Sequence, residues 1–224
     1  MRILLFLVAF VACLGRADLI AQWRGNDFRD ALGKYRLHLQ EYTEVKGNAI
    51  DLQGGLIGGA FTPDGLEFVL TNSLSVSCWV YPRAYAHPYA TSPQSQIVFR
   101  GDDRSGLDPY QLTLSRSGYY AFGIGGEHEM SVLHSPAKLN TWAHVLGTLD
   151  GKTGLMRLYI NGKLVAETTT HVRPLGGLDP AYHPGIGIGN TQFPQGGVHR
   201  QPLDGLIRDV RIYNEAVSPK TAMR

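Results

Sequence analysis

The segment RGDDRSGLDPY, residues 100–110, holds the densest set of side chains that could do chemistry. Asp102, Asp103 and Asp108 offer carboxylate oxygens, which bind hard cations such as calcium and also accept hydrogen bonds from sugar hydroxyls. Tyr110 offers an aromatic face on which a sugar ring could stack. The two arginines of the segment can instead neutralise these acids in exposed ion pairs, which contribute little stability. The segment therefore predicts either a ligand-binding loop or a solvated loop of ion pairs.

A second candidate recognition loop, AYAHPYATSPQ at residues 84–94, is rich in Tyr, Pro and Ser. Tyr85, His87 and Tyr89 are expected at the rim of the fold, where aromatic residues on loops commonly make binding contacts. We therefore place Tyr85, His87 and Tyr89 with the acidic loop among the predicted ligand-binding residues.

Motifs for catalysis are absent from the sequence. It contains neither Gly-x-Ser-x-Gly nor His-Glu-x-x-His. Glu127 and Glu129 would share one face of an extended strand, but we expect them to lie in a solvated loop. Gly185 to Gly189 alternates glycine with isoleucine, which is typical of a strand with one bare face and not of a phosphate-binding turn. We expect no catalytic residues.

Composition excludes several other classes of protein. The 224-residue chain is 43% hydrophobic, which is sufficient for a folded core. Its formal charge of +2 comes from Arg2 and Arg16, because residues 1–17 contain no acid and the remainder holds equal numbers of basic and acidic side chains. A neutral chain has little field to attract polyanions, so we predict no nucleic-acid partner.

The N-terminus has the layout of a secretory signal peptide. Arg2 precedes an apolar run from Ile3 to Cys13, and small residues stand before a cleavage point at Asp18. The run is too short to span a membrane, and no later segment is apolar enough. We predict an exported chain that is extracellular, periplasmic or on the cell surface, with residues 1–17 removed. A lipid anchor at Cys13 is a weaker alternative, because Phe10 begins its motif poorly.

The remaining residues, 18–224, predict a single all-β domain. Short runs rich in Val, Ile, Tyr, Phe and Trp alternate with Gly, Asn, Asp and Pro. Asn161-Gly162 and the loop that begins at Asp150-Gly151 predict a three-stranded antiparallel meander over residues 142–168. The expected strands are Leu19–Trp23, Ala49–Leu52, Phe68–Leu70, Ser75–Tyr81, Gln96–Arg100, Tyr110–Ser115, Tyr119–Ile124, Thr141–Leu149, Leu155–Ile160, Lys163–Thr168, Ile186–Gly189 and Gly205–Tyr213. Such a series of strands forms a sandwich or a barrel.

Four stretches in order resemble laminin-G-like domains of the concanavalin A-like lectin/glucanase superfamily. They are LIAQWRGNDFRDALG, AFTPDGLEFVLTNSLSVSCWVYPR, NTWAHVLGTLDGKTGLMRLYINGKLVAE and PLDGLIRDVRIYNEAVSP. The resemblance spans nearly all of residues 18–224 and implies a two-sheet antiparallel jelly-roll sandwich. It does not imply one activity, because this fold carries lectins, adhesion modules and glycosidases. The acidic triplet of the superfamily's glucanases, Glu-x-Asp-x-x-Glu, does not occur here.

The resemblance also implies a structural calcium where the first and last strands meet. The matching residues are Asp30 and Asp209, and Asn26 could add an amide oxygen. This chain departs from the family pattern because Arg208 replaces an acid, and Arg208 could instead pair with Asp30. Simple alternation places Arg208 on the same face of the strand as Val210 and Ile212.

We therefore expect a secreted, non-catalytic binding module for carbohydrate or a glycosylated surface, with calcium as its only expected cofactor. One alternative is a structural or adhesion module that binds another protein. The other is a glycoside-active enzyme with atypical carboxylates.

Overall fold

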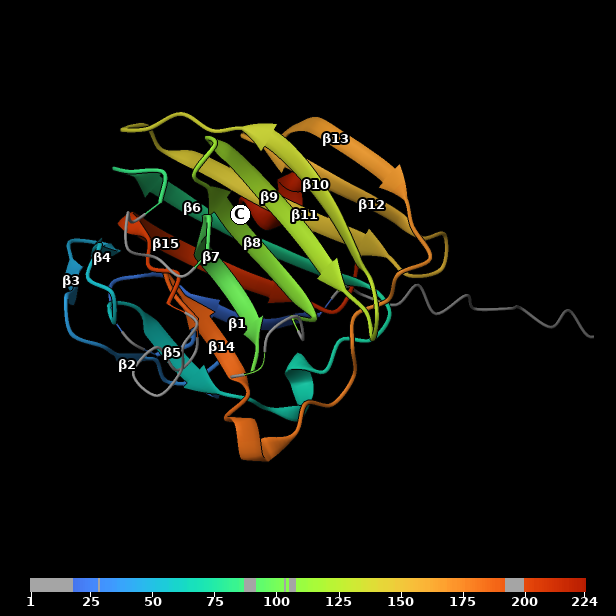
Figure 1. Ribbon diagram of the computed structural model, residues 1–224, viewed down its shortest axis with the longest axis horizontal. Coiled ribbons are helices and arrows are strands. Elements are labelled where there is room, and N and C mark those ends of the chain that lie inside the picture. The colour runs from blue at the N-terminus through green and yellow to red at the C-terminus, as the bar shows by residue number, and fades with distance from the viewer. Residues whose placement is uncertain (1–17, 28, 87–91, 103, 105–107, 192–199) are drawn as a thin grey trace, which may run out of the picture.

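Two antiparallel β-sheets pack face to face in the computed structural model, which confirms the predicted sandwich (Figure 1). The structure describes residues 18–27, 29–86, 92–102, 104, 108–191 and 200–224. The predicted signal peptide and the anchor site at Cys13 lie outside the described residues. Within the described part, no helix is long and apolar enough to cross a membrane.

The first sheet has eight strands, and the last strand of the chain, β15, lies near its centre. Its order is β13-β12-β11-β6-β15-β4-β3, and β1 also pairs with β15. The bounds are β1 Leu19–Trp23, β3 Thr43–Lys46, β4 Ala49–Gln53, β6 Leu74–Pro82, β11 Ala143–Asp150, β12 Leu155–Ile160, β13 Lys163–Thr169 and β15 Asp204–Tyr213. First and last strands therefore lie side by side, as the resemblance implied.

The second sheet has seven strands in the order β10-β9-β8-β7-β14-β5-β2. Its strands are β2 His38–Leu39, β5 Ala60–Pro63, β7 Gln94–Gly101, β8 Tyr110–Ser115, β9 Tyr119–Gly125, β10 Met130–Pro136 and β14 Gly185–Ile188. Three short helices complete the described elements: η1 Leu66–Phe68, η2 Pro180–Tyr182 and α1 Pro219–Ala222.

Strict alternation along β6 shows how the sequence builds the core. Val76, Cys78 and Val80 are fully buried between the sheets. The intervening side chains face outward, and Trp79 is half-buried there. Cys78 is a free thiol whose pKa is raised by burial, so its place is in the packing.

The predicted meander is confirmed, and its turn chemistry is visible. β11 pairs with β12 and β12 with β13, all antiparallel. Asn161 and Gly162 both have positive φ, at 51° and 78°, as a two-residue hairpin turn requires.

Other local predictions were wrong or incomplete. The run Phe68–Leu70 is not a strand, because Leu66–Phe68 forms a 3-10 turn with Phe68 buried. The strands β2, β3, β5 and β10 were not predicted; β10 alternates in burial, but its sequence MSVLHSP does not alternate in polarity.

A β-bulge in β15 changes which side chains face outward. Arg208 pairs with Trp79 and Arg211 with Ser77, so two residues of β15 stand opposite Cys78 alone. The backbone accommodates the extra residue at Asp209, which adopts a left-handed conformation with φ of 53°. The expected alternation was therefore wrong: Val210 and Ile212 are fully buried, whereas Arg208 faces outward.

The chain ends on the outer face of the eight-stranded sheet. Ser218 begins α1 as its N-cap and accepts a hydrogen bond from the Thr221 amide, 3.2 Å away. A small apolar cluster forms there under Val217 and Ala222, with Leu146 and Tyr213 from the sheet. The sandwich therefore has a second, minor core outside its main one.

Gly147 in β11 tests how tightly the two sheets pack. A Cβ on Gly147 would lie 2.2 Å from the ring of Phe122, which is fully buried in the opposite sheet. We expect Gly147→Ala to destabilise the fold by about 1–3 kcal/mol through overpacking. Gly177→Ala is the control, since a Cβ there meets nothing within 4 Å. Equal urea midpoints for the two variants would contradict this account of the packing.

Candidate functional site

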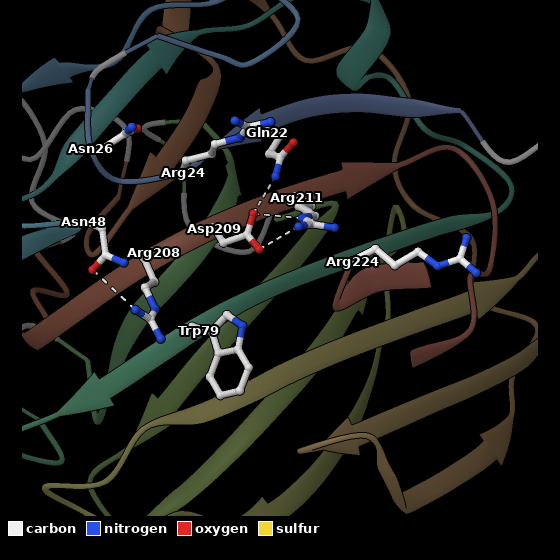
Figure 2. A pocket seen from close by; sticks show the side chains of 9 residues that line it. All are labelled: Gln22, Arg24, Asn26, Asn48, Trp79, Arg208, Asp209, Arg211 and Arg224. Atoms are coloured by element: carbon white, nitrogen blue, oxygen red, sulfur yellow. Dashed lines mark hydrogen bonds and ion pairs between the residues drawn. The ribbon is translucent and has the colours of Figure 1, made fainter. Parts of the chain in front are cut away.

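A cavity lined mainly by polar side chains opens on the outer face of the eight-stranded sheet (Figure 2). Its volume is about 440 Å³, within the range of small-ligand sites. β1 and the segment after it, the β3–β4 turn, β6, β15 and the C-terminal residue contribute to its wall. We call it the arginine–tryptophan pocket; its lining residues are Gln22, Arg24, Asn26, Asn48, Trp79, Arg208, Asp209, Arg211 and Arg224.

The floor of the pocket is a polar network centred on the bulge residue Asp209. Arg211 forms a two-pronged ion pair with this carboxylate, with Nε–Oδ1 at 2.8 Å and Nη2–Oδ2 at 2.7 Å. The Gln22 amide on β1 donates to Oδ1 of Asp209 at 2.6 Å. Burial alone would lower the pKa of Arg211. The hydrogen bonds of Arg211 with Asp209 and Tyr213 have the larger combined effect, so its pKa is raised. Asp209 is thus fully engaged within the protein.

Arg208 lines the pocket beside Trp79 and also contacts the ring of Trp142. Its guanidinium lies 4.6 Å from the ring centre of Trp142 and 5.7 Å from that of Trp79. Its Nη1 donates to Oδ1 of Asn48 at 3.3 Å. Tyr81 continues the aromatic row, with its ring centre 5.7 Å from that of Trp142. The bulge therefore presents a cation that is stacked and held in place.

His144 lies next to this row, below the C-terminal helix. It is 1% exposed, and its ring meets that of Trp79 edge-on at 5.3 Å. Neither ring nitrogen forms a hydrogen bond of good geometry with the described residues. Burial lowers the pKa of His144 to about 4, and the Ala222 backbone opposes this only in part. The histidine is therefore neutral at pH 7.

The residues predicted to bind calcium are placed around Gln22, and both carboxylates among them are engaged by groups of the protein. Asp30 is 3% exposed, and its Oδ1 accepts the Gln22 backbone N–H at 2.7 Å. Asp209 is paired with Arg211, and a guanidinium on a carboxylate occupies the oxygens that a cation needs. Asn26 lines the pocket. Among the described residues no group of three or more His, Cys, Asp or Glu could hold a metal ion.

Arg208 does not pair with Asp30 either, which corrects the alternative considered from the sequence. Its partners are Asn48 and the two tryptophan rings. The bulge places Arg208 opposite Trp79 of β6, whereas Asp30 is bonded to Gln22 near the end of β1.

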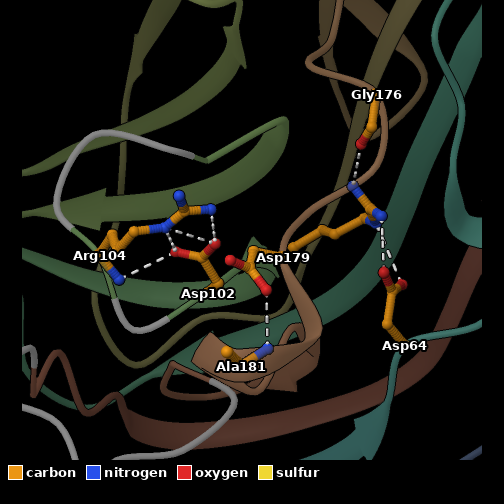
Figure 3. Close-up of polar contacts among 7 residues, drawn as sticks. Asp64, Asp102, Arg104, Gly176, Asp179 and Ala181 are labelled. Carbon is orange, nitrogen blue, oxygen red and sulfur yellow. Dashed lines mark hydrogen bonds and ion pairs between the residues drawn. The ribbon is translucent and has the colours of Figure 1, made fainter.

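The acidic loop between β7 and β8 is largely closed on itself (Figure 3). The Asp102 side chain is fully buried and forms an ion pair with Arg104, whose guanidinium also lies 4.5 Å from the Tyr182 ring centre. Burial, then the charge of Asp102, raises the pKa of Asp108 to about 7. Tyr110 is fully buried and donates to the Phe68 carbonyl at 3.2 Å, so it cannot be the predicted stacking face.

The remaining predicted ligand-binding residues are only partly described. Asp103, His87 and Tyr89 lie outside the described residues. Tyr85 is half-buried, packs against the main core, and donates to the Ala137 carbonyl at 3.4 Å. Glu129 is exposed, as predicted, and meets His171 at 3.0 Å.

Arg100, which was expected in an exposed ion pair, is instead wholly buried. It pairs with Asp64 at 2.7 Å and reaches the Gly176 carbonyl, which ties two loops to β7 (Figure 3). Removing one partner of such a buried pair leaves an uncompensated charge. Its role here is to support the fold.

A set of glutamines lies on the outer face of the seven-stranded sheet. Gln96 donates to Gln111 at 2.8 Å and to Gln201 at 2.9 Å, and its own Oε1 has no partner among the described residues. All three side chains are less than 10% exposed. They form a covered network and not an open site.

Sequence reasoning missed most of the arginine–tryptophan pocket. Gln22, Arg24, Asn48 and Arg211 were not singled out, because they come from three separate parts of the chain. The usable signal was Arg208, which replaces an acid of the family pattern. The direction of the Arg208 side chain depends on the bulge, and the alternation of the sequence does not predict the bulge.

The fold defines a jelly-roll domain, and a comparison with known families agrees. Residues 55–222 match the Laminin_G_3 family model, described as the concanavalin A-like lectin/glucanases superfamily. The chain belongs to this superfamily. It is also 36% identical over 77 residues to the human pentraxin-related protein PTX3 and 38% identical to the Bos taurus protein. These matches cover 32% of this chain and only 20% of the relatives.

Several solved structures share the fold at low sequence identity. Domain 4 of AbnA, an extracellular arabinanase of Geobacillus stearothermophilus solved with arabinotriose, has a TM-score of 0.62 at 22% identity. The alignment covers 92% of this chain and 97% of that domain. The binding domain of botulinum neurotoxin DC, in complex with SialylT, gives 0.65 at 16% identity over 91% and 49% of the chains. A CBM40 of Ruminococcus gnavus IT-sialidase, bound to α2,3 sialyllactose, gives 0.56 at 13% identity over 70% and 83%.

We predict that His144 makes the fold sensitive to acid. Its folded pKa of about 4 lies below the ordinary 6.5, so stability is full above pH 6.5 and falls as the pH drops through 4. The loss should reach about 1–3 kcal/mol and should be absent in His144→Phe. Urea unfolding at pH 4 and pH 7.5 measures it, with exposed His134→Gln as control. A parental pH dependence in His144→Phe would contradict the assignment.

Asp108 should have the opposite pH dependence. Its pKa is raised from 3.8 to about 7, so the folded state keeps a proton that the unfolded chain releases, and stability falls between pH 4 and pH 7. Asp108→Asn should match the parent near pH 4 and be more stable at pH 8. A gain of about 1–3 kcal/mol would raise Tm by several degrees. Exposed Glu44→Gln is the control; a parental Tm for Asp108→Asn at pH 8 would exclude the raised pKa.

Proposed function

We propose that this domain is an exported, non-catalytic module that binds carbohydrate through the arginine–tryptophan pocket. One observation carries the proposal. An aromatic row lies beside an open cavity whose wall combines amide and guanidinium groups. Sugars present apolar ring faces and hydroxyl edges, and this combination of side chains complements both.

Each part of the pocket has a distinct task. The Trp79 indole covers an apolar sugar face, and its edge contact with His144 fixes the ring. Asn26 is exposed, and its amide is available to hydroxyl groups. The network of Asp209, Arg211 and Gln22 keeps the floor rigid, so that little conformational entropy is lost on binding.

The solved structures that share this fold support the proposal, since three of them are complexes with arabinotriose, SialylT and α2,3 sialyllactose. A resemblance at this level of identity establishes the fold alone, so the ligand of this chain rests on its own pocket.

The arrangement of carboxylates supports a role in binding without catalysis. Burial raises the pKa of Asp108 to about 7, which would suit a general acid, and Asp102 is the acid whose charge adds to this effect. However, the Asp102 side chain is fully buried behind Arg104 and cannot reach a substrate. We therefore propose no catalytic residue and, since Asp30 and Asp209 are engaged within the protein, no calcium at their position.

Binding to a glycan array, followed by calorimetry on the strongest ligand, tests the proposal. We expect Trp79→Ala and Trp142→Ala each to weaken binding about three- to tenfold, because each removes an aromatic contact of about 0.5–1.5 kcal/mol. Tyr119→Ala is the matched control, an exposed aromatic on the other sheet. Circular dichroism verifies the fold of every variant.

Three results would contradict the proposal. No signal on the array, together with specific capture of one protein, would favour an adhesion module. A loss of binding in Tyr119→Ala but not in the tryptophan variants would place the site on the other sheet. Release of reducing sugar that disappears in Asp108→Asn would indicate an enzyme.

A further inference from the structure

We infer that the saccharide recognised by the arginine–tryptophan pocket is acidic, carrying a carboxylate or a sulfate group. This inference rests on the proposed function and specifies the class of ligand. It follows from the charges of the pocket, from how each of them is satisfied, and from the neutral groups that lie among them.

The pocket holds more positive charge than the protein neutralises. Four of the nine lining side chains are arginines, and Asp209 is the single acid among them. Arg211 occupies both oxygens of that carboxylate. Arg24, Arg208 and Arg224 therefore remain without a counter-charge in the pocket.

The concentration of charge is local and not a property of the whole chain. Residues 18–224 carry equal numbers of basic and acidic side chains. An adjoining cavity of about 280 Å³ shares Arg24 and Asn26 and also contains Arg29, Asp27 and Asp30. Asp27 and Asp30 accept backbone N–H groups, of Arg29 and of Gln22, and no ion pair joins either of them to Arg24 among the described residues.

The geometry of Arg208 suits it to bind an anion. Stacking on Trp142 and Trp79 fixes the plane of the guanidinium, and Asn48, which is uncharged, accepts from only one of its nitrogens. A guanidinium held in this way keeps donors free for a planar or tetrahedral oxyanion. The Arg208 side chain is already held in one conformation, so little conformational entropy is lost when a ligand binds.

Arg24 and Arg224 are exposed and flexible partners for the same charge. Neither side chain forms a hydrogen bond or an ion pair with another described residue, and both line the pocket (Figure 2). Asn26 and the Trp79 ring lie among these cations. A simple inorganic anion would contact only the arginines, whereas an acidic sugar would contact the arginines through its anionic group and Asn26 and Trp79 through its ring and hydroxyls.

Matched pairs of oligosaccharides test the inference. Oligogalacturonate is compared with its carboxyl-reduced form, and heparin oligosaccharides with their desulfated forms, by calorimetry at 50 and 200 mM NaCl. We expect the acidic member of at least one pair to bind about tenfold or more tightly, as one charged hydrogen bond predicts. The preferred pair identifies the anionic group, and its binding should weaken several-fold at the higher salt.

Arginine variants connect this preference to the pocket. Arg24→Gln and Arg224→Gln should each weaken binding of the acidic ligand about three- to tenfold and change that of a neutral one less than twofold. Neither arginine side chain has a hydrogen-bond or ion-pair partner among the described residues, so both variants should keep the parental Tm. Lys138→Gln removes one exposed positive charge outside the pocket and should have no effect.

The outcomes separate this inference from the proposed function. Equal affinity for both members of each pair would overturn the acidic preference and leave carbohydrate binding intact. Failure of every oligosaccharide on the array to bind would overturn the proposed function as well. Arginine-dependent binding of duplex DNA or an acidic peptide, with none of any glycan, would overturn both.

Discussion

One irregularity in β15, the bulge at Asp209, determines the character of the outer face of the eight-stranded sheet. Without the extra residue, Arg208 and Arg211 could not both point outward while Ile207, Val210 and Ile212 remain in the core. The bulge thus places two arginines on one surface at no cost to the packing beneath. A non-glycine residue at positive φ is strained, and the ion pair with Arg211 compensates for it.

Asp209 also joins parts of the chain that are distant in sequence, through its hydrogen bond with Gln22. Gln22 bonds to Asp209 through its side chain and to Asp30 through its backbone, so β1, the segment after it and β15 form one polar unit. Asp30 and Asp209 are both engaged in bonds that support the fold. Apart from Arg211, the arginines around them therefore have no carboxylate of this unit as a counter-charge. The network of Gln22, Asp209 and Arg211 therefore has two effects: it uses the carboxylate to support the fold, and it leaves the pocket with an excess of positive charge.

The sequence predicted most of the fold because its signals are local. Strict alternation in β6 and the Asn161-Gly162 turn specify the strands, their faces and the meander without any tertiary information. Predictions failed where tertiary contacts override local pattern. Phe68 is buried by a 3-10 turn, and Tyr110, in an otherwise suitable loop position, points into the core.

The pocket was less predictable for the same physical reason. A carboxylate is an equally plausible calcium ligand or ion-pair partner until its neighbours are known, and for Asp209 the deciding neighbour is Arg211 on the far side of a bulge. At this corner Arg208 stands where the family pattern has an acid, so the chain presents a guanidinium where the resemblance implied a ligand for a cation. The charge of this face therefore depends on single side chains, whereas the strand order of the jelly roll does not.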